Sequence, residues 1–231
     1  MARLENQPRA GKTCAVPRVP IAPQARAHGW VSLRPRAAAG KVGPVTVIVV
    51  TGIQAAGKST VAQALAERLD YSVHLRGDVF RRMIVSGRQE MGSADPSAGA
   101  IAQLRLRYQL AAMAADVYAA AGFTVVLQDI IIGAHLPEVV AAIQARPLYV
   151  VVLAPSPQAV EAREGARRLA RGKVAYKPGD QSPAQLDEIF RRETPRIGLW
   201  LDTSAQTAAE TVEEILSRYQ TEAQVGTPSR M

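Results

Sequence analysis

One short segment combines the residue types that bind the phosphates of a nucleotide. Residues 52–60 read Gly-Ile-Gln-Ala-Ala-Gly-Lys-Ser-Thr and fit the pattern G-x-x-x-x-G-K-[ST] in full. Glycines let such a loop curl so that successive backbone N–H groups point at phosphate oxygens. Lys58 is expected to hold the β- and γ-phosphates, and the Ser59 hydroxyl to bind Mg²⁺. The predicted nucleotide-binding residues are Gly52, Ile53, Gln54, Ala55, Ala56, Gly57, Lys58, Ser59 and Thr60.

Two aspartates follow predicted strands and are candidates for contact with a substrate. Asp78 comes after the strand at 71–75, where it is placed to accept a hydroxyl proton, to cap the next helix, or both. Asp129 comes after the strand at 123–127, in the position of an acid near the Mg²⁺ shell; the alternative is a substrate contact. Ligands of open α/β sheets bind beyond the carboxyl ends of the strands, so both carboxylates are expected at that edge.

Basic side chains lie close to these aspartates in the sequence. Arg81 and Arg82 follow Asp78 and could reach an anionic or polar acceptor, although one of them is expected to be a solvated helix residue. Arg76 precedes Asp78 and, with Arg82, is predicted to contact the acceptor. His135 follows Asp129 and is either a further acceptor contact or an ordinary residue at a helix start. These residues complete the predicted acceptor side of the site.

The densest basic cluster of the chain body spans residues 163–173. Arg163 and Arg167 are four residues apart, so on a helix both point the same way and can face one phosphate group. With Arg171 they predict a lid whose arginines close over the nucleotide and stabilise transferred charge. The alternative is a solvated basic face paired with neighbouring glutamates.

The elements that must position these residues alternate between strands and helices. Buried-type strands are predicted at 45–50, 71–75, 123–127, 148–153 and 198–201. Helices are predicted after the phosphate loop and at 79–86, 98–121, 135–145, 157–171, 183–193 and 206–219. The loop at Thr203 either runs beside the nucleotide base or, as we expect, caps the last helix. This order predicts an α/β P-loop NTPase fold, with a five-stranded parallel sheet, helices on both faces and the arginine-bearing lid.

Several classes of P-loop protein lack their signatures here. A guanine-nucleotide switch needs Asn-Lys-x-Asp, yet the only asparagine is Asn6; the Leu-Ser-Gly-Gly-Gln sequence of transporter ATPases is also missing. The body is too short for an AAA+ module with its helical lid domain. What remains is a small ATP-dependent kinase, which needs a positioned hydroxyl, a base and arginines around the phosphoryl group.

Charge is distributed unevenly over the 231 residues. Residues 1–44 hold eight basic side chains, one acidic side chain and six of the 15 prolines, which predicts a disordered basic tail. A functionless extension, an organelle-targeting segment and an arm for an anionic partner stay open as its role. The body is expected to form a kinase domain at 45–220 and a flexible C-terminus at 221–231.

Composition also limits which partners and which location are expected. The body carries 20 basic and 19 acidic side chains, so a nucleic-acid partner is not expected. No apolar run reaches the roughly 20 residues of a membrane helix, and the single cysteine, Cys14, excludes a disulfide framework. A cytoplasmic location is therefore the default expectation.

The order of these segments resembles a known group, the chloramphenicol phosphotransferase-like P-loop kinases, over about residues 45–220. Gly52 to Thr60 resembles its phosphate loop, and Gly77-Asp78 resembles the segment whose aspartate is the base on the drug hydroxyl. The run at 128–133 resembles its Asp-Asp-Val-Phe-Leu-Gly segment, with Gln128 in place of the first acid, and 161–167 resembles its Arg-Glu-x-x-x-Arg lid.

The resemblance implies transfer of the γ-phosphoryl group from ATP, with Mg²⁺, to the hydroxyl of a small molecule. An antibiotic such as chloramphenicol is one candidate acceptor; Arg76 would suit a more anionic one. Asp78, Lys58, Arg163 and Arg167 are the expected catalytic residues. The alternatives are a kinase of a nucleotide-sugar or a polynucleotide 5′-end, and a nucleotide-binding regulatory module without catalysis.

Overall fold

The computed structural model describes residues 45–91, 95–171 and 182–226; within the helix at 157–171 it leaves the side chains at 167, 168, 170 and 171 undescribed. Five parallel strands form the centre of the fold in the order β2-β3-β1-β4-β5. They are β1 (Val47–Thr51), β2 (Ser72–Arg76), β3 (Thr124–Gln128), β4 (Leu148–Leu153) and β5 (Leu199–Leu201). The expected five-stranded parallel sheet is therefore confirmed.

Burial follows the position of each strand in the sheet. Every residue of β1 and of β4 is buried, because both strands have neighbours on two sides and helices on two faces. Strand β2 forms an edge; four of its residues are partly buried, and Arg76 is exposed. An unbroken β-branched run in the sequence thus marks a central strand.

A sixth strand, β6 (Gln224–Val225), pairs antiparallel with the first two residues of β4. It lies in the segment 221–231, for which the sequence predicts a flexible C-terminus. The reason for the pairing is that β5 is short and contacts only Val151 to Leu153, so the start of β4 has a free edge. A two-residue strand carries no hydrophobic period, and the sequence offered no signal for it.

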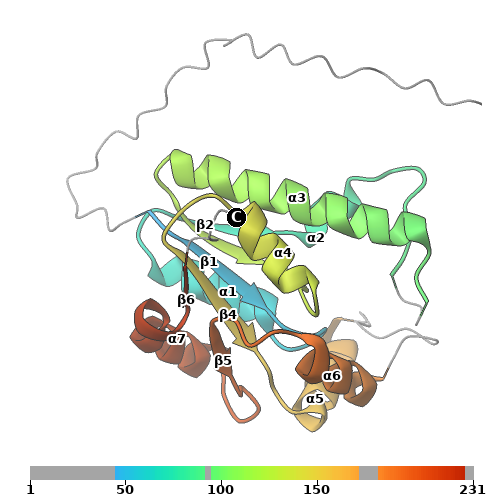
Figure 1. The fold of residues 1–231 in the computed structure, drawn as a ribbon. Helices are drawn as coiled ribbons and strands as arrows, with labels where there is room; N and C mark the ends of the chain where they lie inside the picture. The colour runs from blue at the N-terminus through green and yellow to red at the C-terminus, as the bar shows by residue number, and fades with distance from the viewer. Residues whose placement is uncertain (1–44, 92–94, 172–181, 227–231) are drawn as a thin grey trace, which may run out of the picture. The chain divides into compact units, whose positions relative to one another are not determined.

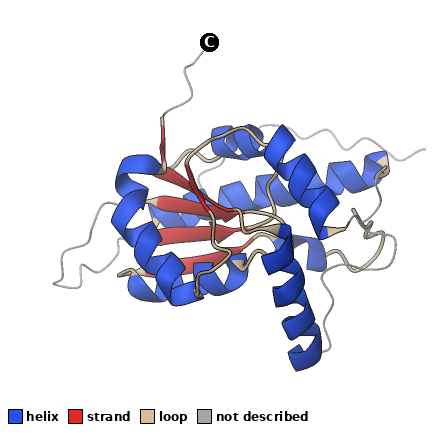
Figure 2. Cartoon of the chain, turned by 90° about the horizontal axis from the view of Figure 1, so that it is seen from below, coloured by secondary structure: helices blue, strands red, loops and turns tan. Residues whose placement is uncertain are grey.

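Helices cover both faces of the sheet, as Figure 2 shows. They are α1 (Lys58–Arg68), α2 (Asp78–Arg82), α3 (Ala98–Ala120), α4 (His135–Ala142), α5 (Pro157–Arg171), α6 (Pro183–Glu193) and α7 (Ala208–Glu222). Helices α1 and α7 contact each other on one face, and α3 and α4 contact each other on the other (Figure 1). Helix α6 buries Phe190 completely and stacks it on Trp200 of β5.

Several helix boundaries differ from expectation. Helix α2 ends at Arg82 and not at 86, and two further differences have local reasons. Helix α4 ends at Ala142, because the carboxylate of Asp116 accepts hydrogen bonds from the backbone N–H groups of Gln144 and Ala145. Helix α7 begins after Thr207, which forms a capping box with Glu210. Thr203 as the cap of the last helix was therefore a wrong prediction. No helix of the described residues is long and apolar enough to cross a membrane.

Candidate active site

The phosphate loop joins β1 to α1 in a conformation that only small residues permit. Gly52 has φ of 141°, and a Cβ there would lie 2.3 Å from the carbonyl oxygen of Leu153 on β4. Gly57, the residue before α1, has φ of 93°, and Ala55 adopts φ of 57° without being glycine. Such left-handed conformations cost energy for a residue with a Cβ, and they commonly occur at ligand-binding loops. The backbone has the curled shape that phosphate binding requires.

Lys58 opens α1 and turns back over the loop. Its Nζ donates a hydrogen bond to the carbonyl oxygen of Ile53 at 2.6 Å, and only 6% of the residue is exposed. The cation is thus held within the loop and at the positive end of α1, where backbone N–H groups favour anions. This is the expected place of the charge that binds phosphates.

Ser59 and Gln128 meet across the sheet. The Ser59 Oγ donates a hydrogen bond to the Oε1 atom of Gln128 at 3.0 Å, because β3 lies beside β1 with Gln128 opposite Val50. The sequence predicts Asp129 near this hydroxyl, but the side chain in contact with Ser59 is Gln128. Both atoms are hard oxygen donors of the kind that Mg²⁺ accepts alongside phosphates and water. The pair therefore fits a magnesium ion bound with a nucleotide.

Asp129 points to the opposite face of the sheet. Successive residues at a strand end point to opposite sides, so Gln128 faces α1 while Asp129 faces α3. Its Oδ2 atom accepts a hydrogen bond from Nε of Arg107 at 2.8 Å, and its Oδ1 atom contacts Nη2 of the same side chain. The Ile130 N–H also donates to Oδ1, at 2.7 Å. Burial raises the pKa of the Asp129 carboxyl, and the charge of Arg107 opposes that shift.

Arg107 did not appear among the sequence candidates. It lies on α3 four and eight residues before Ala111 and Ala115, and all three are buried. A charged residue on the buried side of an apolar helix needs a partner of opposite charge. The position of Arg107 on that side of α3 is the sequence signal that could have identified it. Arg107 binds both oxygens of the Asp129 carboxylate. That Asp129 also takes part in binding a metal therefore stays a prediction.

Asp78 is the first residue of α2, directly beyond the end of β2. Its carboxylate forms an ion pair with Arg82 through Oδ2, and Nε of Arg76 lies 3.9 Å from Oδ1. The Asp78 side chain is 28% exposed, and both arginines are more exposed than that. A third arginine of this segment, Arg81, pairs with Glu90 at 2.7 Å. The structure thus brings Asp78, Arg76 and Arg82 together, with Arg81 close by on the same short helix.

Arg163 of α5 lies against the phosphate loop. Its Nη1 donates a hydrogen bond to the carbonyl oxygen of Ala56 at 3.2 Å and contacts Thr203 Oγ1 at 3.5 Å, while its Nη2 donates to the Thr203 carbonyl oxygen. This side chain therefore joins the phosphate loop to the segment after β5. Arg167 and Arg171 belong to the same helix, but their side chains lie outside the described residues.

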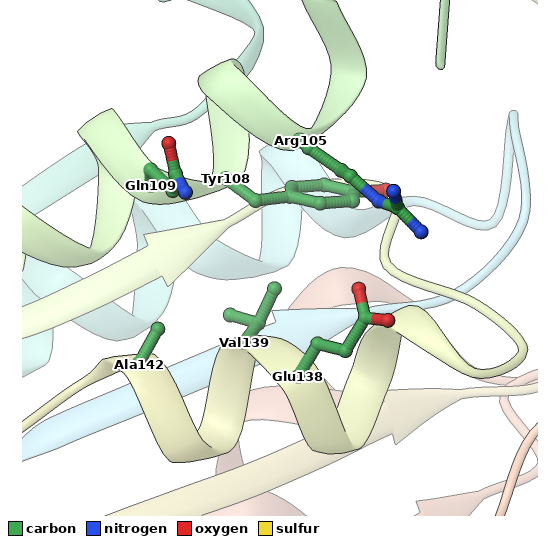
Figure 3. A pocket seen from close by; sticks show the side chains of 6 residues that line it. All are labelled: Arg105, Tyr108, Gln109, Glu138, Val139 and Ala142. Carbon is green, nitrogen blue, oxygen red and sulfur yellow. The ribbon is translucent and has the colours of Figure 1, made fainter. Parts of the chain in front are cut away.

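His135 occupies a different neighbourhood. It opens α4, contacts Glu138 at 3.0 Å and lies beside the ring of Tyr108. Figure 3 shows a hollow between α3 and α4 next to it, lined by Arg105, Tyr108, Gln109, Glu138, Val139 and Ala142. The bond with His135 lowers the pKa of Glu138. The hollow shares no residue with the phosphate loop or with Asp78, and His135 has no recorded contact with either among the described residues.

Comparisons with known proteins agree with this fold. A family model described as an AAA domain, AAA_33, matches residues 47–193. A sugar kinase from Janibacter sp. has a similar structure, with a TM-score of 0.56 and 16% identity over 75% of this chain and 94% of that one. The tunicamycin resistance protein of Deinococcus radiodurans gives a TM-score of 0.51 and 18% identity over 78% and 98%. No curated protein matches the sequence. The two structural matches show a shared fold.

Proposed function

The chain belongs to the AAA_33 family of AAA domains, and from this premise we propose that it is an ATP-dependent kinase that phosphorylates a hydroxyl group of a small molecule. One observation carries the proposal. The phosphate loop, Gln128 and the Gly77–Asp78 turn occupy the carboxyl ends of β1, β3 and β2, which are adjacent in the sheet. A phosphate cradle and a carboxylate that can accept a proton therefore share one edge, where ligands of α/β sheets bind.

Each residue has a part in the proposed transfer. Mg-ATP supplies the phosphoryl group and the charge of the metal. The loop at 52–60 and Lys58 bind the phosphates, and the oxygens of Ser59 and Gln128 hold the Mg²⁺ ion. Asp78 accepts the proton of the attacking hydroxyl as the new P–O bond forms, while the bond from the γ-phosphorus to the bridging oxygen breaks and ADP leaves. No covalent enzyme intermediate is needed, so positioning and charge stabilisation account for the catalysis.

The lid completes the proposed site. Arg163 holds the phosphate loop through Ala56 and brings a guanidinium close to the nucleotide. Arg167 and Arg171 are proposed to extend the same basic face of α5 over the phosphates. Arginine suits this role because its fork of donors matches phosphate oxygens.

The charges around Asp78 bear on which acceptor the site would favour. Arg76, Arg81 and Arg82 give this segment more positive than negative charge, which favours an acceptor with an anionic group near its hydroxyl. This observation supports the second candidate function, a kinase of a nucleotide-sugar or of a polynucleotide 5′-end. An uncharged hydroxylated antibiotic such as chloramphenicol stays in the proposal through the resemblance of the phosphate-loop, base and lid segments. A cytoplasmic location, where ATP is available, is proposed with either acceptor.

The deciding experiment measures ADP release by the full chain with Mg-ATP and one acceptor at a time. The panel contains chloramphenicol, other hydroxylated antibiotics, sugar acids, nucleotide-sugars and a 5′-hydroxyl oligonucleotide. Stimulation by one class supports the kinase and identifies its acceptor. Tight ATP binding with no stimulation by any member would favour the non-catalytic regulatory module instead.

A further inference from the structure

The Arg107–Asp129 pair is unusual among the ion pairs of the described residues. Only 10% of the Arg107 side chain and 2% of the Asp129 side chain are exposed. Every other ion pair of the described residues has at least one partner that is more exposed than this. A buried ion pair seldom stabilises a fold more than well-packed apolar residues would. Its effect is therefore better sought in the geometry that it imposes on its surroundings.

The Asp129 carboxylate lies against Gly77, in the turn before Asp78. A Cβ on Gly77 would lie 2.1 Å from Oδ2 and 2.7 Å from the carboxylate carbon of Asp129. Gly77 has φ of −61° and ψ of −32°, which any residue can adopt, so the backbone conformation does not require glycine. The close approach of the Asp129 carboxylate is what excludes a side chain at this position.

A second contact ties the same turn to the end of β3. The backbone N–H of Gly77 donates a hydrogen bond to the carbonyl oxygen of Gln128 at 3.0 Å. The turn is thus held by the main chain of one residue and packed against the carboxylate of the next. Because Arg107 binds both oxygens of that carboxylate, α3 sets where the carboxylate lies. Asp78 follows Gly77 directly, so its position depends on this contact.

We propose that the buried Arg107–Asp129 ion pair is a positioning pair, which fixes the Gly77–Asp78 turn and thereby the position of the Asp78 carboxylate at the carboxyl edge of the sheet. The inference rests on the proposed function, in which Asp78 accepts the proton of the acceptor. Arg107 and Asp129 act through Gly77 and need touch neither the nucleotide nor the acceptor. A loss of position of about 1 Å in such a site lowers the rate on the order of 100-fold.

Two conservative variants test the pair. Arg107→Lys keeps the charge but loses the two-pronged contact, and Asp129→Asn keeps the shape but loses the charge. The control is Asp116→Ala on the same helix, which removes the carboxylate that binds the backbone N–H groups of Gln144 and Ala145. All three are expected to lower the melting temperature, so stability alone does not distinguish them.

The first readout is amide hydrogen exchange in the peptide covering residues 76–82, measured on the full chain without any acceptor. Arg107→Lys and Asp129→Asn are expected to speed exchange at Gly77 and the start of α2 by roughly 10-fold or more, whereas Asp116→Ala leaves it unchanged. The second readout is turnover with the acceptor that the ADP-release panel identifies. Both pair variants are expected to lower kcat by roughly 10- to 100-fold while the Kd for Mg-ATP changes less than about twofold.

Gly77→Ala tests the contact between Gly77 and the Asp129 carboxylate without altering the charge of Arg107 or Asp129. This variant replaces a pair variant that fails to fold. The added methyl group must displace the turn or the carboxylate, so the same faster exchange and lower kcat are expected. Unchanged exchange in 76–82 for all these variants would overturn the proposal. It would also be overturned if Asp129→Asn raised the Mg²⁺ requirement while Arg107→Lys did not, because Asp129 would then be a metal ligand.

Failure of the proposed function has a separate signature. If the wild-type chain phosphorylates no acceptor, hydrogen exchange still reports whether the pair holds the turn. Faster exchange in the pair variants would then support the structural part of the inference, and unchanged exchange would refute it.

Discussion

Replacing Asp78 by asparagine separates its two candidate roles, as the base and as the residue that opens α2. Asparagine keeps the size and shape of the side chain but cannot accept a proton at neutral pH. The Asp78 side chain is 28% exposed and pairs with Arg82, whose side chain is 63% exposed. The stability that depends on the charge is therefore small.

The expected magnitudes follow from that exposure. Loss of an exposed ion pair costs about 0.2–1 kcal/mol, and loss of a negative charge at a helix start costs about 0.3–1 kcal/mol. Loss of a general base lowers kcat by roughly 100- to 10,000-fold, which corresponds to about 3–5 kcal/mol of transition-state free energy. If Asp78 is the base, the effect on turnover must greatly exceed the effect on stability.

The assay compares three quantities for wild type and Asp78→Asn: kcat with the identified acceptor, the Kd for Mg-ATP, and the free energy of unfolding. The matched control is Glu213→Gln, which breaks the exposed ion pair with Arg68 between α7 and α1. The control is expected to lose about as much stability while kcat stays at the wild-type value. The reasoning is refuted if kcat of Asp78→Asn falls less than about tenfold, or if the affinity for ATP falls in parallel with it.

Three further perturbations have defined outcomes. Lys58→Met removes the ammonium that contacts Ile53 and is expected to weaken ATP binding by roughly 10- to 100-fold in titration calorimetry, so unchanged affinity would contradict phosphate binding by Lys58. Gly165→Ala places a methyl group where no described atom lies within 4 Å on α5, so chemical denaturation should show a gain of about 0.5–1 kcal/mol; a loss would mean that the site is not open. Burial raises the pKa of Tyr108, so the unfolded chain loses this proton first and stability falls as pH rises above about 10. Tyr108→Phe should lose stability less steeply there, and parallel curves would contradict the shift.

The sequence by itself was sufficient for the phosphate loop and for the parallel sheet. A phosphate loop is a local structure: glycine at 52 and 57, lysine at 58 and serine at 59 specify its backbone and chemistry within a few residues. Strands such as β1 and β4 are recognisable because a strand covered on both faces is apolar at every position. Both predictions depend on patterns among residues that are close together in the sequence.

Only the tertiary structure decided which side chains meet. Ser59 and Gln128 are 69 residues apart and Arg107 and Asp129 are 22 apart, so neither contact has a local pattern. At the end of β3, adjacent side chains point to opposite faces of the sheet. Gln128 therefore reaches the phosphate loop on the face of α1, and Asp129 reaches Arg107 on the face of α3.

The lid also has a part that the sequence predicts and a part that only the tertiary structure decides. Its basic cluster is visible in the sequence, but the partners of Arg163 are the carbonyl oxygens of Ala56 and Thr203, on two segments far from α5 in the chain. Strand β6 also depends on tertiary structure, since it fills the edge of β4 that β5 leaves open. Contacts of this kind follow from strand order and register, which the packing of the whole chain determines.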